Sequence, residues 1–395
     1  MMGQRTINIM TACDDNYARL IFPQLVSIHE NLGDYQVNFF LLHSRVSSET
    51  IANLTDYCDS LGMVKFWPIL VDKNLEVFSL LASNGGNSMV NRTTAYPFES
   101  YFLLDCHNWL PNWVDRVLYI HTGDVVFLRD ISEYYFSDFA DKSLTVEAGA
   151  NLVKDRADGQ VVLYGEEDQG AFIERYKENG SYFNSGSFMI NVERLRNLGR
   201  SLEYFLGVRE KFMSILPESP TGKYYRGDQA FFAVAFLGEV HPFREPTGEE
   251  LNYREYGYTP LALRSRVLRK LPEMVDPKII HFDGMFKPWQ LEPNFFSGGI
   301  PANVSEGNYF QEFHDFQLIV FQRFCAAYWS FAELSPVYNE MVNDATRFSG
   351  WMKATYLPLM RLDIKHRQRC VRLENRIRQI NSKAAELQAL AVRVA

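Results

Sequence analysis

The chain has 395 residues, of which 47% are hydrophobic and 22% are charged, and its formal net charge is −8. This hydrophobic content supports a large buried core and excludes a disordered chain. The charge is unevenly divided, because residues 347–395 carry a net +8 and residues 1–346 carry −16. A body this acidic excludes general nucleic-acid binding, which needs a basic face for the phosphates.

The cellular compartment is indicated by three further features. The first residues, MMGQRTINIM, contain no apolar core of a signal peptide. The chain has no apolar run of about 20 residues that could span a bilayer. Its five cysteines form no CxxC pair, which is typical of reduced thiols in a cytosolic protein. We therefore expect a cytoplasmic protein, with its basic C-terminal residues available to the inner face of a membrane.

The first third of the chain alternates between strand and helix patterns. Apolar runs rich in β-branched and aromatic residues predict strands, and apolar residues at helical spacing predict helices. This β-α-β-α-β order predicts parallel strands with right-handed crossovers, and a ligand crevice outside their carboxyl ends. The predicted elements are strands over 6–12, 37–42 and 64–69 and helices over 17–32 and 48–61.

The rest of the chain continues the α/β pattern and then becomes helical. We expect three parts: an α/β domain over 1–300, a helical region over 301–358, and a basic amphipathic helix or short coiled coil over 359–395. The further predicted elements are helical stretches over 97–109, 228–236 and 306–346 and strands over 116–120, 125–128, 187–191 and 278–282.

A heptad seam runs through the last predicted part. Its apolar positions are spaced alternately four and three residues apart, with basic residues around them. Three interpretations stay open: a helix docked on the parent domain, a self-associating coiled coil that makes a homo-oligomer, or a helix lying on a membrane surface. The seam residues are Leu373, Ile377, Ile380, Ala384, Leu387, Ala391 and Val394.

Four motifs are informative when they are taken together and in their order along the chain. They are ACDDNY at 12–17, VLYIHTGDVVFLRDI at 117–131, YFNSGSFMIN at 182–191 and IIHFDGMFKPW at 279–289. Together they resemble the family 8 glycosyltransferases, over roughly residues 5–290. The resemblance implies a GT-A fold, which is a Rossmann-like nucleotide-sugar-binding domain, with a C-terminal helical extension. It also implies retaining transfer of a hexose from a UDP-sugar to a glycan or glycolipid acceptor, as in bacterial lipopolysaccharide or capsule assembly.

A nucleotide-sugar enzyme must hold a diphosphate, which favours a divalent cation, here Mn²⁺ or Mg²⁺. The family usually has Asp-x-Asp after a strand, and Asp124 matches its second Asp. The first is replaced by His121, with an inserted glycine, or by Thr122. His121 is the better ligand for Mn²⁺. His281 matches the family's third ligand. Alternatively, His121 only ends a strand, and the protein is a catalytically impaired nucleotide-sugar-binding or scaffold protein with a degenerate metal motif.

The resemblance also implies contacts to the donor. A carboxylate and an amide can bind the uracil and ribose edges, and a tyrosine can stack on uracil. The same polar residues could instead only cap the following helix. A glycine lets the backbone approach a phosphate, and a lysine offsets the charge of departing UDP, an effect typically worth ~3 kcal/mol. These donor-binding residues are Ala12, Asp14, Asn16, Tyr17, Asn184, Gly284 and Lys287.

Asp228 and Gln229 resemble the family's residues at the donor sugar, where they would act in catalysis. Alternatively they only begin a helix. One departure concerns an arginine that the family often has before the metal motif. Residues 97–111 contain no arginine, and Glu99 or Leu103 lies near its expected place, so the choice of donor sugar stays open.

Overall fold

The computed structural model describes residues 5–82, 98–147, 183, 185–215, 227–243, 252–254, 277–282, 287–290 and 324–351. The chain divides into two compact units, one of residues 1–288 and 313–338 and one of residues 289–312 and 339–395. In the second unit the description consists mainly of α12 (Tyr338–Trp351). The predicted boundaries at 300 and 358 lie outside the described residues and stay predictions.

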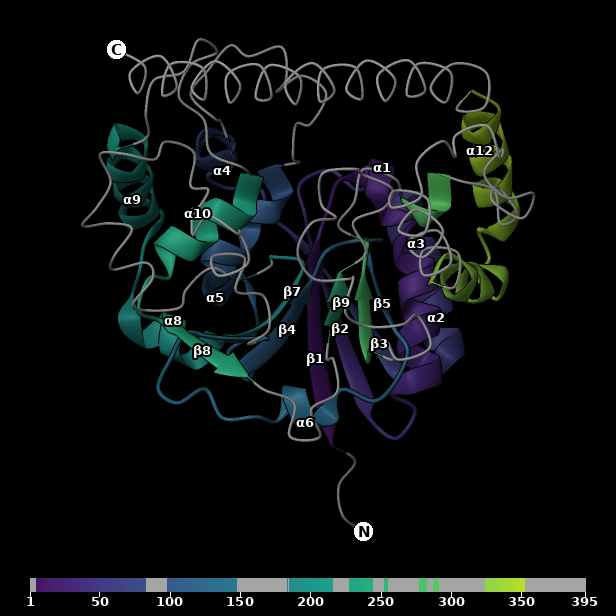
Figure 1. The fold of residues 1–395 in the computed structure, drawn as a ribbon, viewed down its shortest axis with the longest axis horizontal. Coiled ribbons are helices and arrows are strands. Elements are labelled where there is room, and N and C mark those ends of the chain that lie inside the picture. Colours follow the sequence, from purple (N-terminus) through teal and green to yellow (C-terminus); the bar gives the residue numbers. More distant parts are fainter. Residues whose placement is uncertain are drawn as a thin grey trace, which may run out of the picture. The chain divides into compact units, whose positions relative to one another are not determined.

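The first unit contains a seven-stranded sheet with the strand order β3-β2-β1-β4-β7-β6-β8 (Figure 1). Strand β1 pairs in parallel with β2 and β4, and β2 pairs in parallel with β3, which confirms the predicted β-α-β-α-β unit. Strand β7 runs antiparallel between β4 and β6. The strands are β1 (Thr6–Ala12), β2 (Gln36–His43), β3 (Val64–Leu70), β4 (Arg116–Ile120), β6 (Leu144–Glu147), β7 (Ser187–Asn191) and β8 (Val240–Phe243).

A second, three-stranded sheet has the order β5-β10-β9. It consists of β5 (Val125–Phe127), β10 (Ile279–His281) and β9 (Asn252–Arg254). Strand β10 runs antiparallel to β5 in a register that places His281 opposite Val125. This register brings residues more than 150 positions apart in the sequence to the loop that follows β4.

Helices cover both faces of the large sheet. Successive side chains along a strand point to opposite faces and so belong to two separate hydrophobic cores. In β2, Phe40 and Leu42 belong to one core, while Phe39 and Leu41 belong to the other. The first core also includes residues of α4 (Leu75–Ala82), η2 (Phe98–Asp105), α5 (Cys106–Trp109), α8 (Val192–Leu198), α9 (Leu202–Ile215) and α10 (Gly227–Ala235). The second includes residues of α2 (Ile21–Asn31), α3 (Ser48–Leu61) and α6 (Ser132–Tyr135).

The helix predicted over 17–32 is wrong in one respect, because the structure divides it. A short helix, α1 (Asp15–Ala18), precedes α2. Pro23 explains the break: it has no N–H to donate to the carbonyl of Arg19, and its ring disfavours a helix through that residue. Asp14 caps α1, since its Oδ1 accepts a hydrogen bond of 3.1 Å from the backbone N–H of Asn16.

The other predicted elements that fall on described residues are present, with shifted ends. The aromatic stretch over 97–109 is a 3₁₀ helix, η2, followed by α5, and the strand predicted over 278–282 is shortened to β10. Of the predicted helices over 306–346, residues 324–333 and 338–351 are helical. Residues 306–323 and the heptad seam over 373–394 lie outside the described part.

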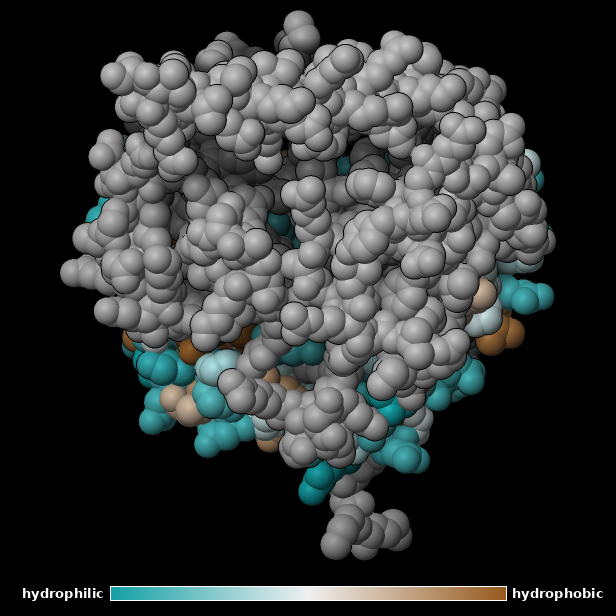
Figure 2. Space-filling model, viewed as in Figure 1, coloured by the Kyte–Doolittle hydropathy of each residue, from teal (hydrophilic) through white to brown (hydrophobic). Residues whose placement is uncertain are grey.

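In the part of the chain that the structure describes, no helix is both long and apolar enough to cross a bilayer. On the face seen in Figure 2, the described side chains that reach the surface are mostly hydrophilic, with a few hydrophobic ones between them. Cys13, Cys58 and Cys106 are buried free thiols, as the sequence predicted for this part of the chain.

An ion pair joins α8 to the loop before β8. The Glu239 carboxylate accepts hydrogen bonds from Arg194 Nε at 2.7 Å and Nη2 at 2.9 Å, and from Ser143 Oγ at 2.8 Å. The bond to Arg194, opposed by partial burial, lowers the pKa of Glu239 from 4.5 to about 2. A carboxylate whose pKa is lower in the folded state stabilises the fold above its unfolded pKa, and this stabilisation is lost as pH falls toward the folded value.

We expect Glu239→Gln to lower the free energy of unfolding by about 1–3 kcal/mol at pH 7, because it removes hydrogen bonds to a charged group. The difference from wild type should be full above pH 5 and should shrink between pH 4.5 and 2. Urea denaturation across this range measures it. Glu193→Gln, at an exposed position in α8, is the matched control. A deficit that is the same at pH 3 and pH 7 would contradict this account.

Candidate metal centre

The site is built around the loop that follows β4, His121-Thr122-Gly123-Asp124. Gly123 has a positive φ of 75°, and a Cβ built on it would lie 2.7 Å from Leu20 Cβ. Both facts require glycine here, the first for backbone conformation and the second for space. Gly123 thereby turns the chain back so that Asp124 lies near His121.

Gln24, in α2, holds this loop in place through its side chain. Its buried side-chain amide donates to the carbonyl oxygen of His121 at 2.8 Å and to that of Val125 at 2.9 Å. The two carbonyls flank the loop, so one side chain fixes both of its ends. Sequence reasoning missed Gln24. The available signal was a polar residue within a run of helical positions that are otherwise apolar.

The side chain of Thr122 points toward β1. Its Oγ1 lies 3.1 Å from the carbonyl oxygen of Ala12 and 2.5 Å from Thr11 Oγ1, both in β1. The Thr122 side chain is buried there and ties β4 to β1. Of the two residues considered for the family's first Asp, His121 is the one whose side chain lies with Asp124.

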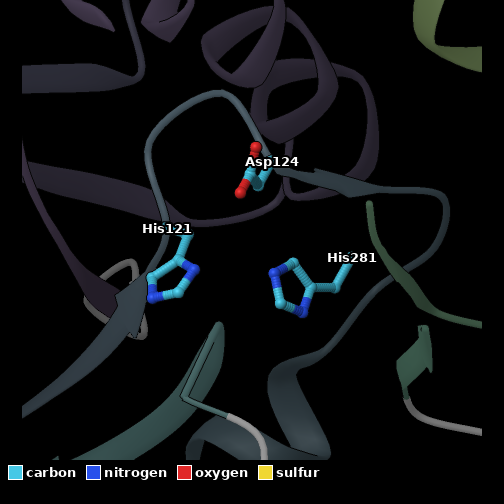
Figure 3. Close-up of side chains that lie close together, drawn as sticks. All are labelled: His121, Asp124 and His281. Atoms are coloured by element: carbon cyan, nitrogen blue, oxygen red, sulfur yellow. The ribbon is translucent and has the colours of Figure 1, made fainter. Parts of the chain in front are cut away.

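His121, Asp124 and His281 form a cluster whose ligand atoms all lie within 4.8 Å of one another (Figure 3). The two imidazole rings have centroids 5.3 Å apart and are nearly perpendicular, at 79°. Asp124 Oδ2 accepts from Lys287 Nζ at 2.8 Å. Asp124 Oδ1 is buried, and no hydrogen-bond partner for it is found within the described ranges. A buried carboxylate oxygen beside two imidazoles fits a divalent ion such as Mn²⁺.

His281 reaches the cluster because Gly186 has no side chain. A Cβ on Gly186 would overlap the imidazole of His281. The same glycine accepts a backbone hydrogen bond of 2.9 Å from His121, and Phe282 donates one of 2.8 Å to Asp124. The ends of β4 and β10 and the turn before β7 are therefore joined through backbone bonds at the cluster. Sequence reasoning missed Gly186, although it lies in the YFNSGSFMIN motif.

Asp228 contacts the imidazole of His121. It is in the first turn of α10 and is 3% exposed. Its Oδ2 is 3.2 Å from His121 Nε2, and its Oδ1 accepts from Ser185 Oγ at 3.2 Å. A predicted catalytic residue is thus in direct contact with a predicted metal ligand.

The sequence profile of glycosyl transferase family 8 matches residues 8–292. The chain belongs to this family. No curated protein sequence matches it. Among solved structures, the galactosyltransferase LgtC in complex with donor and acceptor sugar analogues is similar, with 19% identity, 78% of this chain and 95% of LgtC covered, and a TM-score of 0.50. The apo structure of the bifunctional glycosyltransferase WbbM is also similar, with 14% identity, 88% of this chain and 53% of WbbM covered, and a TM-score of 0.54.

These findings confirm the predicted family and the GT-A fold. The seven-stranded sheet with helices on both faces is the nucleotide-sugar-binding architecture that the four motifs implied. The protein is therefore a glycosyltransferase.

In this family 8 glycosyltransferase, the segment after β1 lies at the same sheet edge as the cluster of His121, Asp124 and His281, because β1 and β4 are parallel. Asp14 and Asn16 bond to each other through Asp14 Oδ2 and Asn16 Nδ2, at 2.9 Å. Tyr17 is 40% exposed, and burial together with the charge of Asp124 raises the pKa of its phenol. The capping role is therefore present, and binding of uridine by these residues stays a prediction.

Near this segment, the glycosyltransferase has an arginine that sequence reasoning missed. Glu99 is fully buried and accepts from Ser44 Oγ at 2.8 Å. Arg45, whose side chain is 66% exposed, places Nε 3.9 Å from Glu99 Oε1 and Nη2 4.0 Å from Asp14 Oδ2. No arginine is present in 97–111, and Arg45, in the loop after β2, places its guanidinium beside Glu99 and Asp14.

The structure thus gathers most of the predicted site residues at one sheet edge. His121, Asp124, His281, Asp228 and Lys287 are linked by the contacts given above, and Ala12 ends β1 beside Thr122. Asn184 and Gly284 lie outside the described residues, and for Gln229 the structure describes only the backbone in α10. The roles of these three residues stay predictions.

Proposed function

We propose that this family 8 glycosyltransferase is a retaining enzyme that moves a hexose from a UDP-sugar to a hydroxyl of a glycan acceptor, in lipopolysaccharide or capsule assembly. The observation that carries the proposal is the clustering of His121, Asp124 and His281 at the carboxyl ends of β4 and β10. Such an edge is where ligands bind in open α/β sheets. The glycan acceptor is further supported by the likeness to LgtC, whose structure contains donor and acceptor sugar analogues.

The three ligands would hold a divalent ion through two imidazole nitrogens and one carboxylate oxygen. Nitrogen ligands favour Mn²⁺ over Mg²⁺, which prefers oxygen. When bound, the ion would supply positive charge for the diphosphate of the departing UDP. Lys287, which is bonded to Asp124 Oδ2, would add a second positive charge at the same place.

The other residues would bind and orient the donor. Ala12, Asp14, Asn16 and Tyr17 would hold the uridine, Asn184 and Gly284 would contact the sugar and phosphates, and Asp228 and Gln229 would act at the sugar. The acceptor hydroxyl would attack on the face from which UDP leaves, because a glutamine amide is a weak nucleophile. The bond from the anomeric carbon to UDP breaks, the new glycosidic bond forms, and the hydroxyl proton passes to the departing phosphate.

A donor screen that measures release of UDP with Mn²⁺, Mg²⁺ or no metal tests the proposal. We expect one UDP-hexose to be turned over fastest with Mn²⁺ and hardly at all after chelation. The catalytically impaired alternative predicts no release with any donor. An absence of any thermal shift with Mn²⁺ and UDP would count against a binding site altogether, since a ligand of the folded state must stabilise it.

A peripheral membrane location is a separate part of the proposal. The net charge of +8 over residues 347–395 supports contact with an anionic membrane face, where each basic residue near the surface contributes about 1 kcal/mol. We expect the full chain to sediment with anionic vesicles and a chain ending at residue 358 to remain in solution. Equal sedimentation would contradict this, and self-association through the heptad seam would instead appear as a change in oligomeric state.

A further inference from the structure

The two ring nitrogens of His121 face different groups. Nε2 lies 3.2 Å from Asp228 Oδ2. In Figure 3 the other ring nitrogen lies on the side of Asp124 and His281. Asp228 is 3% exposed, and its remaining oxygen accepts from Ser185 Oγ at 3.2 Å. Asp228 is therefore held in place from one side and contacts His121 on the other.

This arrangement decides which nitrogen of His121 carries the proton. An ionised carboxylate only accepts hydrogen bonds, so a bond between Asp228 and Nε2 requires the proton on Nε2. The neutral imidazole then has its lone pair on Nδ1, and a lone pair is what a metal ligand needs. We infer that Asp228 is a positioning residue that fixes His121 as the Nε2–H tautomer and directs the Nδ1 lone pair toward the ion. The inference rests on the proposed metal site.

Two features of this chain support the inference. First, His121 stands near a place where the family usually has an aspartate, so the exchange removes one negative charge from the site. The Asp228 carboxylate lies one hydrogen bond from the histidine that takes this place, in the pattern of a carboxylate behind a metal-bound histidine. Second, the Ser185-Gly186 turn holds both halves of the pair, because Ser185 bonds Asp228 while Gly186 accepts from the backbone N–H of His121.

The role differs from a direct contact to the donor sugar, which the sequence predicted for Asp228. A sugar contact would affect binding and turnover of the donor and would leave binding of Mn²⁺ to the nucleotide-free protein unchanged. A positioning role would weaken binding of Mn²⁺ before any donor is present. Affinity for Mn²⁺ therefore separates the two roles.

The test uses the nucleotide-free full chain and Mn²⁺ alone, with free Mn²⁺ measured by electron paramagnetic resonance. Asp228→Asn keeps the shape and an oxygen for Ser185, but its amide donates toward Nε2 and favours the wrong tautomer of His121. We expect the Kd for Mn²⁺ to rise about 10–100-fold, as for other partners of metal ligands. Ser185→Ala removes a hydrogen bond to Asp228 but keeps the carboxylate beside His121, so it should raise the Kd less than Asp228→Asn does. Asp130→Asn, at an exposed position outside the site, is the matched control and should stay near wild type.

A double-mutant cycle completes the test. In a His121→Ala background, Asp228→Asn should raise the Kd no further, because the residue through which Asp228 acts is gone. An unchanged Kd in the single variant, or an equal further rise in the His121→Ala background, would overturn the inference. The first of these results together with altered donor kinetics would support the sugar contact instead.

The tautomer can also be read without metal and without a variant of Asp228. Imidazole ¹⁵N shifts of the metal-free wild type, assigned by comparison with His121→Ala, should show a proton on Nε2 of His121. A proton on Nδ1 would overturn the inference even if Asp228→Asn failed to fold. If instead the wild type bound no Mn²⁺ while its His121 carried the proton on Nε2, the proposed metal site would fail and the positioning of His121 by Asp228 would stand.

Discussion

Asp124→Asn should lower metal-dependent transfer by about 100-fold or more, a loss typical of removing one group that stabilises charge in the transition state. Asp124 is the only carboxylate of the proposed ligand set, and its buried Oδ1 faces no hydrogen-bond donor within the described residues. An amide there is neutral and a poor ligand. Asparagine is preferred to alanine because its oxygen can still accept from Lys287, which otherwise would lose its 2.8 Å bond.

Two measurements check this expectation. Titration with Mn²⁺ should show a large rise in Kd, and the thermal midpoint in the absence of metal should stay close to that of wild type. Asp130→Asn is the matched control, because Asp130 is an exposed carboxylate that accepts a hydrogen bond of 2.7 Å from the backbone N–H of Ser132, and an asparagine oxygen can accept the same bond. Transfer by Asp124→Asn at the wild-type rate, with an unchanged Kd for Mn²⁺, would refute the assignment of Asp124 as a ligand.

The elements that were predicted correctly from the sequence are those whose apolar residues follow a regular local spacing. Strands β1 and β2 are mostly apolar and buried because helices cover both faces of the sheet, and such runs can be recognised without knowing their neighbours. The three cluster residues were also found, but through the resemblance to the family rather than through spacing. His281 lies 157 positions after Asp124, and only the pairing of β10 with β5 brings them together.

The parts that were missed depend on contacts between distant segments. In the sequence, Gln24 is a single polar residue in an apolar helix. Its role depends on hydrogen bonds to two backbone carbonyls about 100 positions away. Arg45 lies in a loop after β2 and becomes relevant only because Asp14 and the buried Glu99 are beside it. The break before α2 has a local cause, because Pro23 disrupts the helix at the residue four positions earlier. The helical spacing of the apolar residues nevertheless predicts one continuous helix.

Gly186→Ala is the second change for which we expect a large effect. The added methyl group would overlap the ring of His281, and neither side can yield easily. Ser187 is paired with Ile120 at the start of β7, and Gly186 itself accepts the 2.9 Å bond from His121. The backbone is therefore held, and the imidazole must leave its position. We expect the Kd for Mn²⁺ to rise at least about 10-fold, since misplacing one ligand costs a metal site much of its affinity.

The free energy of unfolding should also fall, by about 1–3 kcal/mol, as is typical when a methyl group is forced into a packed site. Gly207→Ala is the matched control, because a Cβ at Gly207 in α9 meets nothing within 4 Å and alanine favours a helix. In a His281→Ala background the ring is gone, so the same Gly186→Ala change should cost little stability. A loss of stability that persists there would show that the methyl group clashes with the backbone rather than with His281. Normal binding of Mn²⁺ by Gly186→Ala would mean that the position of His281 does not matter for the ion, and the cluster would then lose its third ligand.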